Sequence, residues 1–255
     1  MTLARRAQVF TESSGQVVQF SLNGSHLPPL VKTVRVAEAF RSAVLAAFQV
    51  VSGNRESFVL SGHEANGKPD HGHRHGFYLP VPDEDGKIVS VYVVSPVERF
   101  SMAEMEALKL IRVLQWNRPS TRTRVDLISD DDSTLNQVAA TWSTITPYVP
   151  PRRFYGTPGK HHLTPEKQLV AELTQVTPGI YQVEELRKVS DWLVDTRVPN
   201  QPNGVRQRLN ARRQGFYVRF RATAPLCGPV LLGHSTHFGL GQFRPNVSRP
   251  CDSPT

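Results

Sequence analysis

Cysteine and long apolar runs are what this sequence has least of. Its only two cysteines, Cys227 and Cys251, are too few for a disulfide scaffold and lack the paired spacing of a metal site. No apolar run reaches the length of about 20 residues that a membrane-spanning helix needs. The start of the chain, MTLARRAQVF, lacks the apolar core of a signal peptide. We therefore expect a cytoplasmic protein with no membrane partner.

Acidic residues are in the minority. The chain has 255 residues, with 30 Lys and Arg against 22 Asp and Glu, and a formal net charge of +8. A basic surplus favours an anionic partner, of which nucleic acid is the first candidate. The hydrophobic fraction of 39% is enough for one large core or two modest ones. These numbers favour a globular protein that binds nucleic acid.

Apolar periodicity in the first half predicts strands and helices in a characteristic order. Alternation marks the strands, helical spacing of apolar residues marks the helices, and PDEDGK is a tight hairpin turn. The predicted elements are a strand at 16–22, a helix at 34–51, strands at 76–81 and 88–94, a helix at 101–114 and a strand at 125–128. The order β-α-β-β-α-β is the ferredoxin-like pattern.

The acidic stretch DDDSTLN divides this pattern from the rest of the chain. We therefore predict two domains, 1–130 and 131–255. In the second domain the sequence TPEK begins a helix, because Thr suits the N-cap and Pro the first helical position. The segment after PGIYQ is ambiguous, and we interpret it as another helix from Val183.

Three histidines alternate just before the strand predicted at 76–81. In DHGHRHGFYLP, His71, His73 and His75 would line one face of an extended chain. Imidazole has the pKa nearest neutrality and suits both proton transfer and metal ligation. The segment can equally be a solvated His-rich turn. The pattern alone leaves these alternatives open.

Arginine is concentrated in two segments. In PPRRFYG, a guanidinium suits phosphate while the adjoining aromatic ring can stack on a base. In RQRLNARRQGFYVRFR, apolar and basic residues alternate, which predicts a strand with a buried face and a cationic, phosphate-binding face. A cationic run can also be a simple solvated face. The arginines predicted to bind nucleic-acid phosphates are Arg152, Arg153, Arg212, Arg213 and Arg219.

Glycines flank two more histidines in GPVLLGHSTHFGLGQF. Glycine allows the backbone to approach a phosphate and present N–H groups to it. The segment is neither a P-loop nor a dinucleotide-binding fingerprint, and a β-bulge or tight hairpin is the alternative. The residues predicted to contact a phosphate here are Gly233, His234, His237, Gly239 and Gly241.

Taken in order, these segments resemble one protein family. DHGHRHGFYLP, DEDGKI, TWSTITPYVPPR, GFYVRF and GPVLLGHSTHFGLGQF are similar to the C-terminal half of the fused Cas-five/Cas-six protein of type I-U (I-G) CRISPR systems. The glycine-rich ending also resembles that of the wider superfamily of repeat-associated RNA-binding proteins. That superfamily's fold is a tandem of ferredoxin-like domains. The resemblance implies an α+β fold with two such domains and antiparallel sheets.

The resemblance also implies an activity. A Cas-six-type protein is a metal-independent endoribonuclease, without cofactor, that cuts CRISPR precursor RNA within its repeats. Its product stays bound in an effector complex with other Cas subunits. The Cas-five half is absent from this sequence, so we expect a stand-alone subunit, a split gene product or a fragment. The family's second Asp-His pair is replaced by Val89 and Ser90, so its role is not carried over.

RNA supplies its own nucleophile, the 2′-hydroxyl, so the enzyme needs a base, an acid and a stabiliser of the phosphorane. The expected products are a 2′,3′-cyclic phosphate and a 5′-hydroxyl. His73 and His75 match the family's histidine pair and are the acid–base candidates, with Tyr78 as a weaker helper and His63 in reserve. Alternatively, His234 and His237 approach the same phosphate from the glycine-rich segment.

Two other functions fit the same residues. The first is a non-catalytic subunit that binds CRISPR RNA through the arginines. The second is a metal-dependent hydrolase whose ligands are His71, His73 and His75, completed by Asp70 or Asp83.

Overall fold

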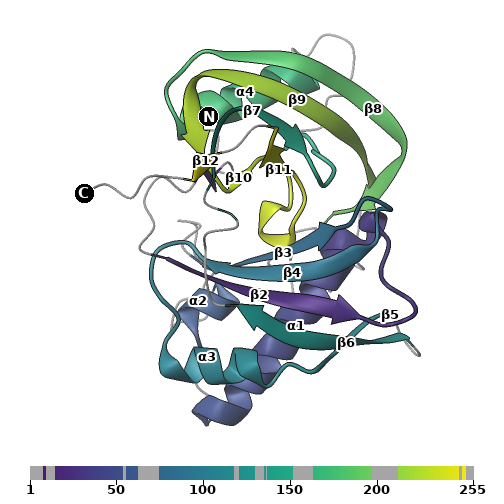
Figure 1. Cartoon of the computed structure of the whole chain (residues 1–255), viewed down its shortest axis with the longest axis vertical. Coiled ribbons are helices and arrows are strands. Elements are labelled where there is room, and N and C mark those ends of the chain that lie inside the picture. Colours follow the sequence, from purple (N-terminus) through teal and green to yellow (C-terminus); the bar gives the residue numbers. More distant parts are fainter. Residues whose placement is uncertain are drawn as a thin grey trace, which may run out of the picture.

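The computed structural model describes residues 8–9, 15–53, 56–62, 75–117, 121–129, 135, 137–151, 163–196, 212–246 and 249–250. Within these residues the chain forms two antiparallel sheets, one above the other in Figure 1. The lower sheet has five strands and the upper one seven. No helix in the described ranges is long and apolar enough to cross a membrane.

The lower sheet is built by the first half of the chain. In chain order its elements are β2 (Gln16–Asn23), the short 3₁₀ helix η1 (Leu30–Lys32), α1 (Thr33–Ser52), α2 (Phe58–Ser61), β3 (Phe77–Pro82), β4 (Ile88–Ser95), α3 (Met102–Lys109), β5 (Val113–Asn117) and β6 (Thr121–Ser129). The strand order is β3-β4-β2-β6-β5. The last strand of the motif thus lies beside the first, as in a ferredoxin-like domain, which confirms the predicted β-α-β-β-α-β order.

The predicted helix at 101–114 is correct at its start and wrong at its end. The Ser101 hydroxyl accepts from the Glu104 amide at 3.3 Å, and the Glu104 carboxylate accepts from the Ser101 amide at 2.7 Å, which completes a capping box. The helix ends at Lys109 because the following residues form β5, which pairs with β6. Leu114 is buried between exposed neighbours, and this alternation belongs to a strand.

The upper sheet is built mainly by the second half of the chain. Its elements are β7 (Gln137–Thr144), α4 (Pro165–Val176), β8 (Tyr181–Asp195), β9 (Arg212–Cys227), β10 (Val230–Leu231), the 3₁₀ helix η2 (Thr236–Phe238), β11 (Gln242–Pro245) and β12 (Arg249–Pro250). The central order β11-β7-β9-β8 repeats that of the lower sheet. A glycine-rich loop with η2 occupies the place of the second helix. The fold is therefore α+β with two ferredoxin-like units, as predicted.

Two helices were predicted for the second half of the chain. The helix at α4 begins as expected, with the Thr164 hydroxyl accepting from the Lys167 amide at 3.3 Å. The helix predicted from Val183 is wrong, because this segment is the long strand β8. Its Glu, Leu, Arg and Lys content favours a helix locally. The backbone pairs with β9 instead, and Val183 and Leu186 pack on the core of the sheet.

The first strand of the chain does not join the lower sheet. β1 (Gln8–Val9) pairs with β10 of the upper sheet, while the lower sheet begins at β2. The predicted division into 1–130 and 131–255 stays a prediction. Cys227 at the end of β9 is disulfide-bonded, which the sequence analysis did not anticipate. Cys251 lies outside the described residues.

Both faces of the β3–β4 hairpin are buried. One face packs on α1 and α3, and the other carries a small cluster in which Phe77, Leu79, Tyr92 and Val94 meet Leu231 of β10. Open sheet faces often bind RNA in ferredoxin-like domains. This part of the lower sheet has no open face of that kind, because the upper half of the chain covers it.

Candidate active site

The glycine-rich loop rests directly on strand β3. A Cβ on Gly239 would lie 2.5 Å from Cδ of Pro80, and this glycine has a left-handed φ of +77°. The Gln242 side-chain amide donates to the carbonyl oxygens of Pro80, at 2.7 Å, and of Gly239, at 2.8 Å. A close glycine contact and a bridging amide thus fix the loop against the hairpin.

This packing brings two histidines from the two halves of the chain into contact. The ring centroids of His75 and His237 are 4.1 Å apart with an interplanar angle of 26°. Those of Phe77 and His237 are 3.8 Å apart at 18°. The rings of His75 and Phe77 are each so close to the His237 ring, and so nearly parallel to it, that both cannot stack on the same face of it. The His237 ring therefore lies between the other two.

Local backbone geometry explains where the His75 ring stands. Positions 75 and 77 alternate along the start of β3, so their rings share one side. Gly62, the C-cap of α2, faces His75, and a Cβ there would lie 2.8 Å from the imidazole. The Gly76 amide donates to the Val59 carbonyl at 2.6 Å, which ties the strand to α2. The backbone thus fixes the position of the His75 ring, and Gly62, which has no side chain, leaves the room that the ring occupies.

The two imidazoles share one backbone neighbour. Nδ1 of His75 and Nδ1 of His237 lie 3.4 and 3.5 Å from the carbonyl oxygen of Gly76. A carbonyl oxygen only accepts, so a hydrogen bond to it requires the proton on Nδ1. In a neutral ring the lone pair is then on Nε2. Such a pair can supply a neutral base and a protonated acid, because two stacked rings resist carrying two positive charges.

Tyr78 lies on the opposite side of β3, as strand alternation requires. Its side chain is 1% exposed in the core of the lower sheet, and its hydroxyl donates to the Leu60 carbonyl at 3.1 Å. Burial raises the pKa of this phenol well above its ordinary value. This position argues against the predicted catalytic helper, because the hydroxyl is buried, already bonded and turned away from the two histidines.

Several predicted residues lie outside the described part of the chain. They are His63, His71, His73, Arg152 and Arg153. Their roles stay predictions, as does the metal site that would need His71 and His73. Among the described residues, no group of three or more His, Cys, Asp and Glu side chains is arranged to hold a metal ion.

His234 has a different environment from His237. Its Nδ1 lies 2.6 Å from the Ser235 hydroxyl, and its amide donates to the Val149 carbonyl at 2.8 Å. The residue is 9% exposed. Of the two histidines in the glycine-rich loop, it is His237 that the structure brings to His75.

The amides of the three predicted glycines are used within the protein. Gly233 donates to the Glu172 carboxylate at 3.0 Å, Gly239 to the Thr236 carbonyl at 2.9 Å, and Gly241 to the Pro147 carbonyl at 3.0 Å. The expected cradle of N–H groups for a phosphate is therefore wrong for these amides. The glycines instead provide left-handed turns and close backbone packing, since each has a φ between +63° and +97°.

The cationic face predicted for β9 is present. Phe216, Val218 and Phe220 are buried against α4, while the Arg219 and Arg221 side chains are 47% and 58% exposed on the other face. The cross-strand partner of Arg219 is Ser143, whose partner on β11 is Arg244, which is also exposed. We call Arg219, Arg221 and Arg244 the arginine row. Arg244 stood outside the basic segment that sequence reasoning selected.

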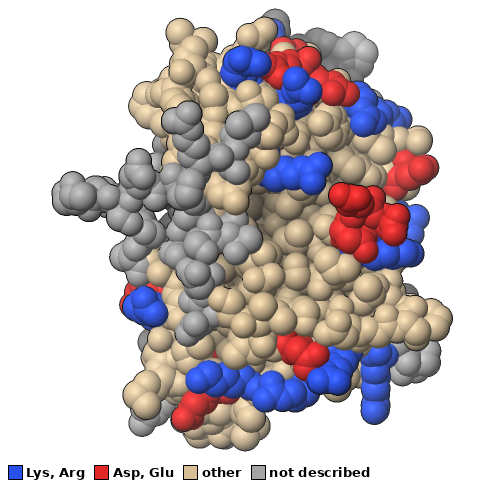
Figure 2. All heavy atoms as spheres, viewed as in Figure 1, with Lys and Arg blue, Asp and Glu red and all other residues tan. Residues whose placement is uncertain are grey.

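A carboxylate accompanies the arginine row. Both Nε atoms, of Arg219 and of Arg221, donate to Glu184 at 2.7 Å. Hydrogen bonds from Arg221 and Arg219 hold the pKa of Glu184 below its ordinary value. Figure 2 shows basic side chains beside acidic ones over the upper half of the molecule. Glu184 thus orientates Arg219 and Arg221, and the side chains of the row are still open to solvent.

Arg212 and Arg213 lie at the far end of β9 and have structural partners. Arg212 Nε is 3.7 Å from the buried carboxylate of Asp195, which also accepts from Arg35 of α1 at 2.7 Å. Arg213 donates to the Pro150 carbonyl at 3.5 Å. At about 3.4 Å per residue, Arg213 is roughly 20 Å from Arg219 along the strand. The structure therefore does not bring these two arginines into the arginine row.

Comparison with known proteins gives structural likeness only. No protein-family model matches the sequence, and no characterised protein matches it by sequence. A Cas6b crystal structure is similar with a TM-score of 0.48 and 10% identity, covering 90% of this chain and 98% of that one. A Cas6 product complex has a TM-score of 0.45 and 16% identity over 92% and 100% of the two chains. A protein described as a RAMP protein binding different RNA substrates has a TM-score of 0.40 and 14% identity over 90% and 98%.

Proposed function

We propose that this protein is a CRISPR repeat-RNA endoribonuclease of the Cas-six type that works without a metal ion. The observation that carries the proposal is the contact of His75 with His237. The two residues belong to DHGHRHGFYLP and GPVLLGHSTHFGLGQF, two of the segments that resemble the family. Two imidazoles in contact can supply the one base and the one acid that acid–base cleavage of RNA requires.

In the proposed reaction a neutral imidazole removes the proton of the 2′-hydroxyl. The 2′-oxygen then bonds to the adjacent phosphorus, and the bond from phosphorus to the 5′-oxygen breaks. A protonated imidazole gives its proton to that departing oxygen. The products are a 2′,3′-cyclic phosphate and a 5′-hydroxyl, and each histidine ends in the protonation state opposite to its first one. His73, two residues before His75, stays a further candidate for one of these roles.

The arginine row supports RNA as the substrate. Exposed guanidinium groups suit the phosphates of a nucleic-acid backbone, and the net charge of +8 agrees with an anionic partner. Arg152 and Arg153 are proposed to add to this surface. By resemblance, the cut RNA stays bound and joins other Cas subunits in the cytoplasm. These partners and this location are part of the proposal.

Cleavage of the cognate repeat RNA in the presence of a chelator tests the proposal. The wild type is expected to cut and leave a cyclic phosphate, which acid treatment opens. His75→Ala and His237→Ala should each lower the single-turnover rate by about 10²–10⁴-fold without loss of RNA binding. His73→Ala and His63→Ala are assayed beside them, with Met102→Ala on the exposed face of α3 as the surface control.

Three results would contradict the proposal. Tight binding without cleavage would indicate a non-catalytic RNA-binding subunit, which the arginine row alone would explain. Loss of cleavage in chelator and its return with a divalent metal would indicate the metal-dependent hydrolase. Full activity of both His75→Ala and His237→Ala would show that the histidine pair is not the active site.

A further inference from the structure

A second site lies at the opposite end of strand β3 from the histidine pair. A cavity of about 380 Å³ opens between the β2–η1 connection, the tip of the β3–β4 hairpin and β5. The residues that line it are Gly24, Ser25, His26, Leu27, Lys87 and Trp116. None of these six is acidic. A volume of this size is within the range of about 300–1,000 Å³ of pockets that hold small ligands.

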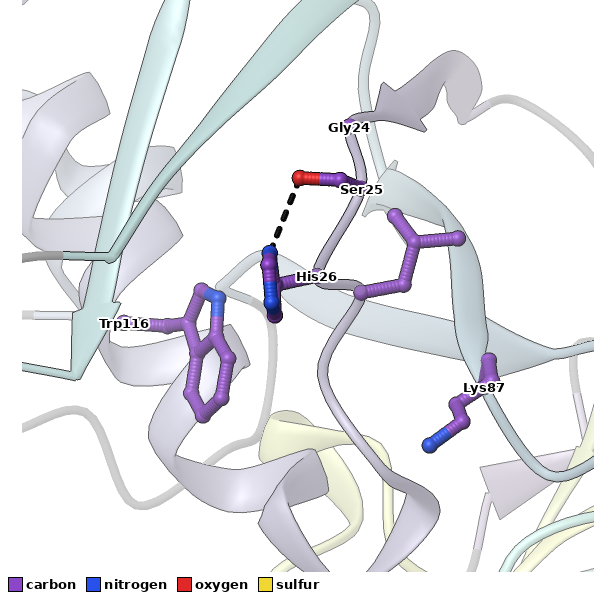
Figure 3. Close-up of a pocket in the computed structure, with 6 residues that line it drawn as sticks. Gly24, Ser25, His26, Lys87 and Trp116 are labelled. Carbon is purple, nitrogen blue, oxygen red and sulfur yellow. Dashed lines mark hydrogen bonds between the residues drawn. The ribbon is translucent and has the colours of Figure 1, made fainter.

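The pocket combines two aromatic rings with one cation. Figure 3 shows the imidazole of His26 beside the indole of Trp116, with Lys87 of the hairpin across the pocket from both rings. The indole N–H donates to the Thr123 hydroxyl at 3.2 Å, which fixes the ring by its edge. Nδ1 of His26 lies 2.8 Å from the Ser25 hydroxyl. The aromatic rings are therefore orientated before a ligand arrives.

The backbone that carries Lys87 is also held in place. Its amide donates to the Asp83 carboxylate at 2.8 Å within the hairpin turn. The neighbouring Ile88 amide donates to the Pro28 carbonyl at 2.7 Å, and the Leu30 amide donates to the Gly86 carbonyl at 2.8 Å. These bonds join the hairpin tip to the segment that carries His26. The backbone of Lys87 thus keeps a fixed position relative to the segment that carries His26.

We propose that this pocket binds one unpaired nucleotide of the RNA. An indole face stacks on any base, and a lysine ammonium pairs with phosphate as a point charge. The identity of the ligand as RNA rests on the proposed function. The pocket itself is separate from the histidine pair, because the six residues of β3 span about 20 Å at about 3.3 Å each. The nucleotide would therefore flank the cleaved bond at a distance.

Binding of adenosine 5′-monophosphate to the full chain tests the pocket without RNA cleavage. The nucleotide is expected to quench tryptophan fluorescence, with adenosine and inorganic phosphate each binding more weakly. Lys87→Ala should weaken the binding of the nucleotide and leave the binding of adenosine unchanged. A wild-type protein that shows no quenching with the nucleotide would overturn the proposal.

Binding of labelled repeat RNA is the second measurement. Trp116→Ala and Lys87→Ala should each lower the affinity about tenfold. Trp116→Phe keeps a stacking ring and should retain most of the affinity, which separates a lost stack from a misfolded variant. Lys109→Ala on α3 is the matched charge control and should bind as the wild type does. RNA binding by Trp116→Ala and Lys87→Ala equal to that of the wild type would overturn the proposal.

The two proposals can fail separately. If the nucleotide quenches the tryptophan fluorescence but the protein neither binds nor cuts repeat RNA, the proposed function is contradicted and the nucleotide-binding pocket is retained. A protein that binds and cuts repeat RNA with no response to the nucleotide contradicts the pocket and keeps the function.

Discussion

Gly239 and Pro80 approach each other so closely that even a single methyl group on the glycine would collide with the proline ring. The contact joins the glycine-rich loop to β3 and places His237 against His75. The distance between the catalytic candidates is therefore set by a pair of residues that take no part in the chemistry.

Gly239→Ala is expected to lower cleavage sharply. The left-handed backbone costs an alanine about 1–2 kcal/mol, and the collision with Pro80 adds to this and moves the loop. Gly53, the C-cap of α1, is the matched control, because its φ is +66° and a Cβ there meets nothing within 4 Å. Gly53→Ala should show the backbone cost in denaturant unfolding and keep its activity. Equal activity of the two variants would contradict the role of the contact.

Gly62→Ala acts on the other histidine. A Cβ at this position would lie 2.8 Å from the His75 ring, so the ring must leave its present position against His237. We expect a loss of about 10- to 100-fold in the single-turnover rate, with RNA affinity unchanged. Gly53→Ala again controls for the left-handed backbone. A rate equal to that of the control would show that the position of His75 does not matter.

Glu184→Gln should strengthen RNA binding. The Glu184 carboxylate accepts hydrogen bonds from Arg219 and Arg221. Without its charge, both guanidinium groups can bind RNA phosphates instead. Exposed ion pairs are weak, so we expect a gain of no more than about fivefold in affinity. Glu98→Gln, an exposed change of the same charge, is the control in a filter-binding assay. An equal gain in both variants would mean that only net charge matters.

Glu184 also predicts a pH dependence of stability. Its pKa is lower in the folded protein than in the unfolded chain, so the folded state binds this proton less tightly. The stability that Glu184 contributes is present above its ordinary pKa of 4.5, and it is lost as the pH falls through the lowered pKa of the folded state. The difference in unfolding free energy between wild type and Glu184→Gln should therefore shrink in acid. A difference that stays constant down to about pH 3 would contradict this.

Tyr148 predicts the opposite behaviour at high pH. Its hydroxyl donates to the Glu172 carboxylate at 3.0 Å, and burial together with that carboxylate raises the pKa of Tyr148 well above 10.0. The folded state holds this proton more tightly than the unfolded chain does. The contribution is complete below pH 10.0 and is lost as the pH rises through the raised value.

Tyr148→Phe should therefore cost about 1–3 kcal/mol near neutrality, and the difference from wild type should narrow above about pH 10. Denaturant unfolding by circular dichroism measures both. Tyr217→Phe, on the opposite side of β9 from the core, is the control for loss of a phenol. A difference that does not change with pH would show that the Tyr148 hydroxyl does not carry it.

The sequence predicted the elements whose signals are local. The hairpin turn at Asp83, the capping box at Ser101 and the Thr164 N-cap each depend on residues within a few positions. Strand alternation also predicted correctly that Tyr78 faces away from His75. The β8 strand was missed because its pairing with β9, the next strand of the chain, overrides a helical composition.

The candidate site could be predicted only in part for the same reason. Both His75 and His237 stood among the candidates, but their contact depends on how Gly239 packs on Pro80 across the two halves. The amide bonds of Gly233 and Gly241 were also beyond prediction, since their acceptors, Glu172 of α4 and Pro147 after β7, lie far away in the sequence. Residue type indicated the chemistry, and nonlocal packing decided which residues meet.

The histidine pair takes one ring from the start of β3 and one from the loop before β11, a much later segment of the chain. A nascent chain whose lower sheet has just folded would therefore hold only half of the pair. Under the proposed function such a chain could not yet hydrolyse RNA, and cleavage would begin only when the glycine-rich loop docks on β3.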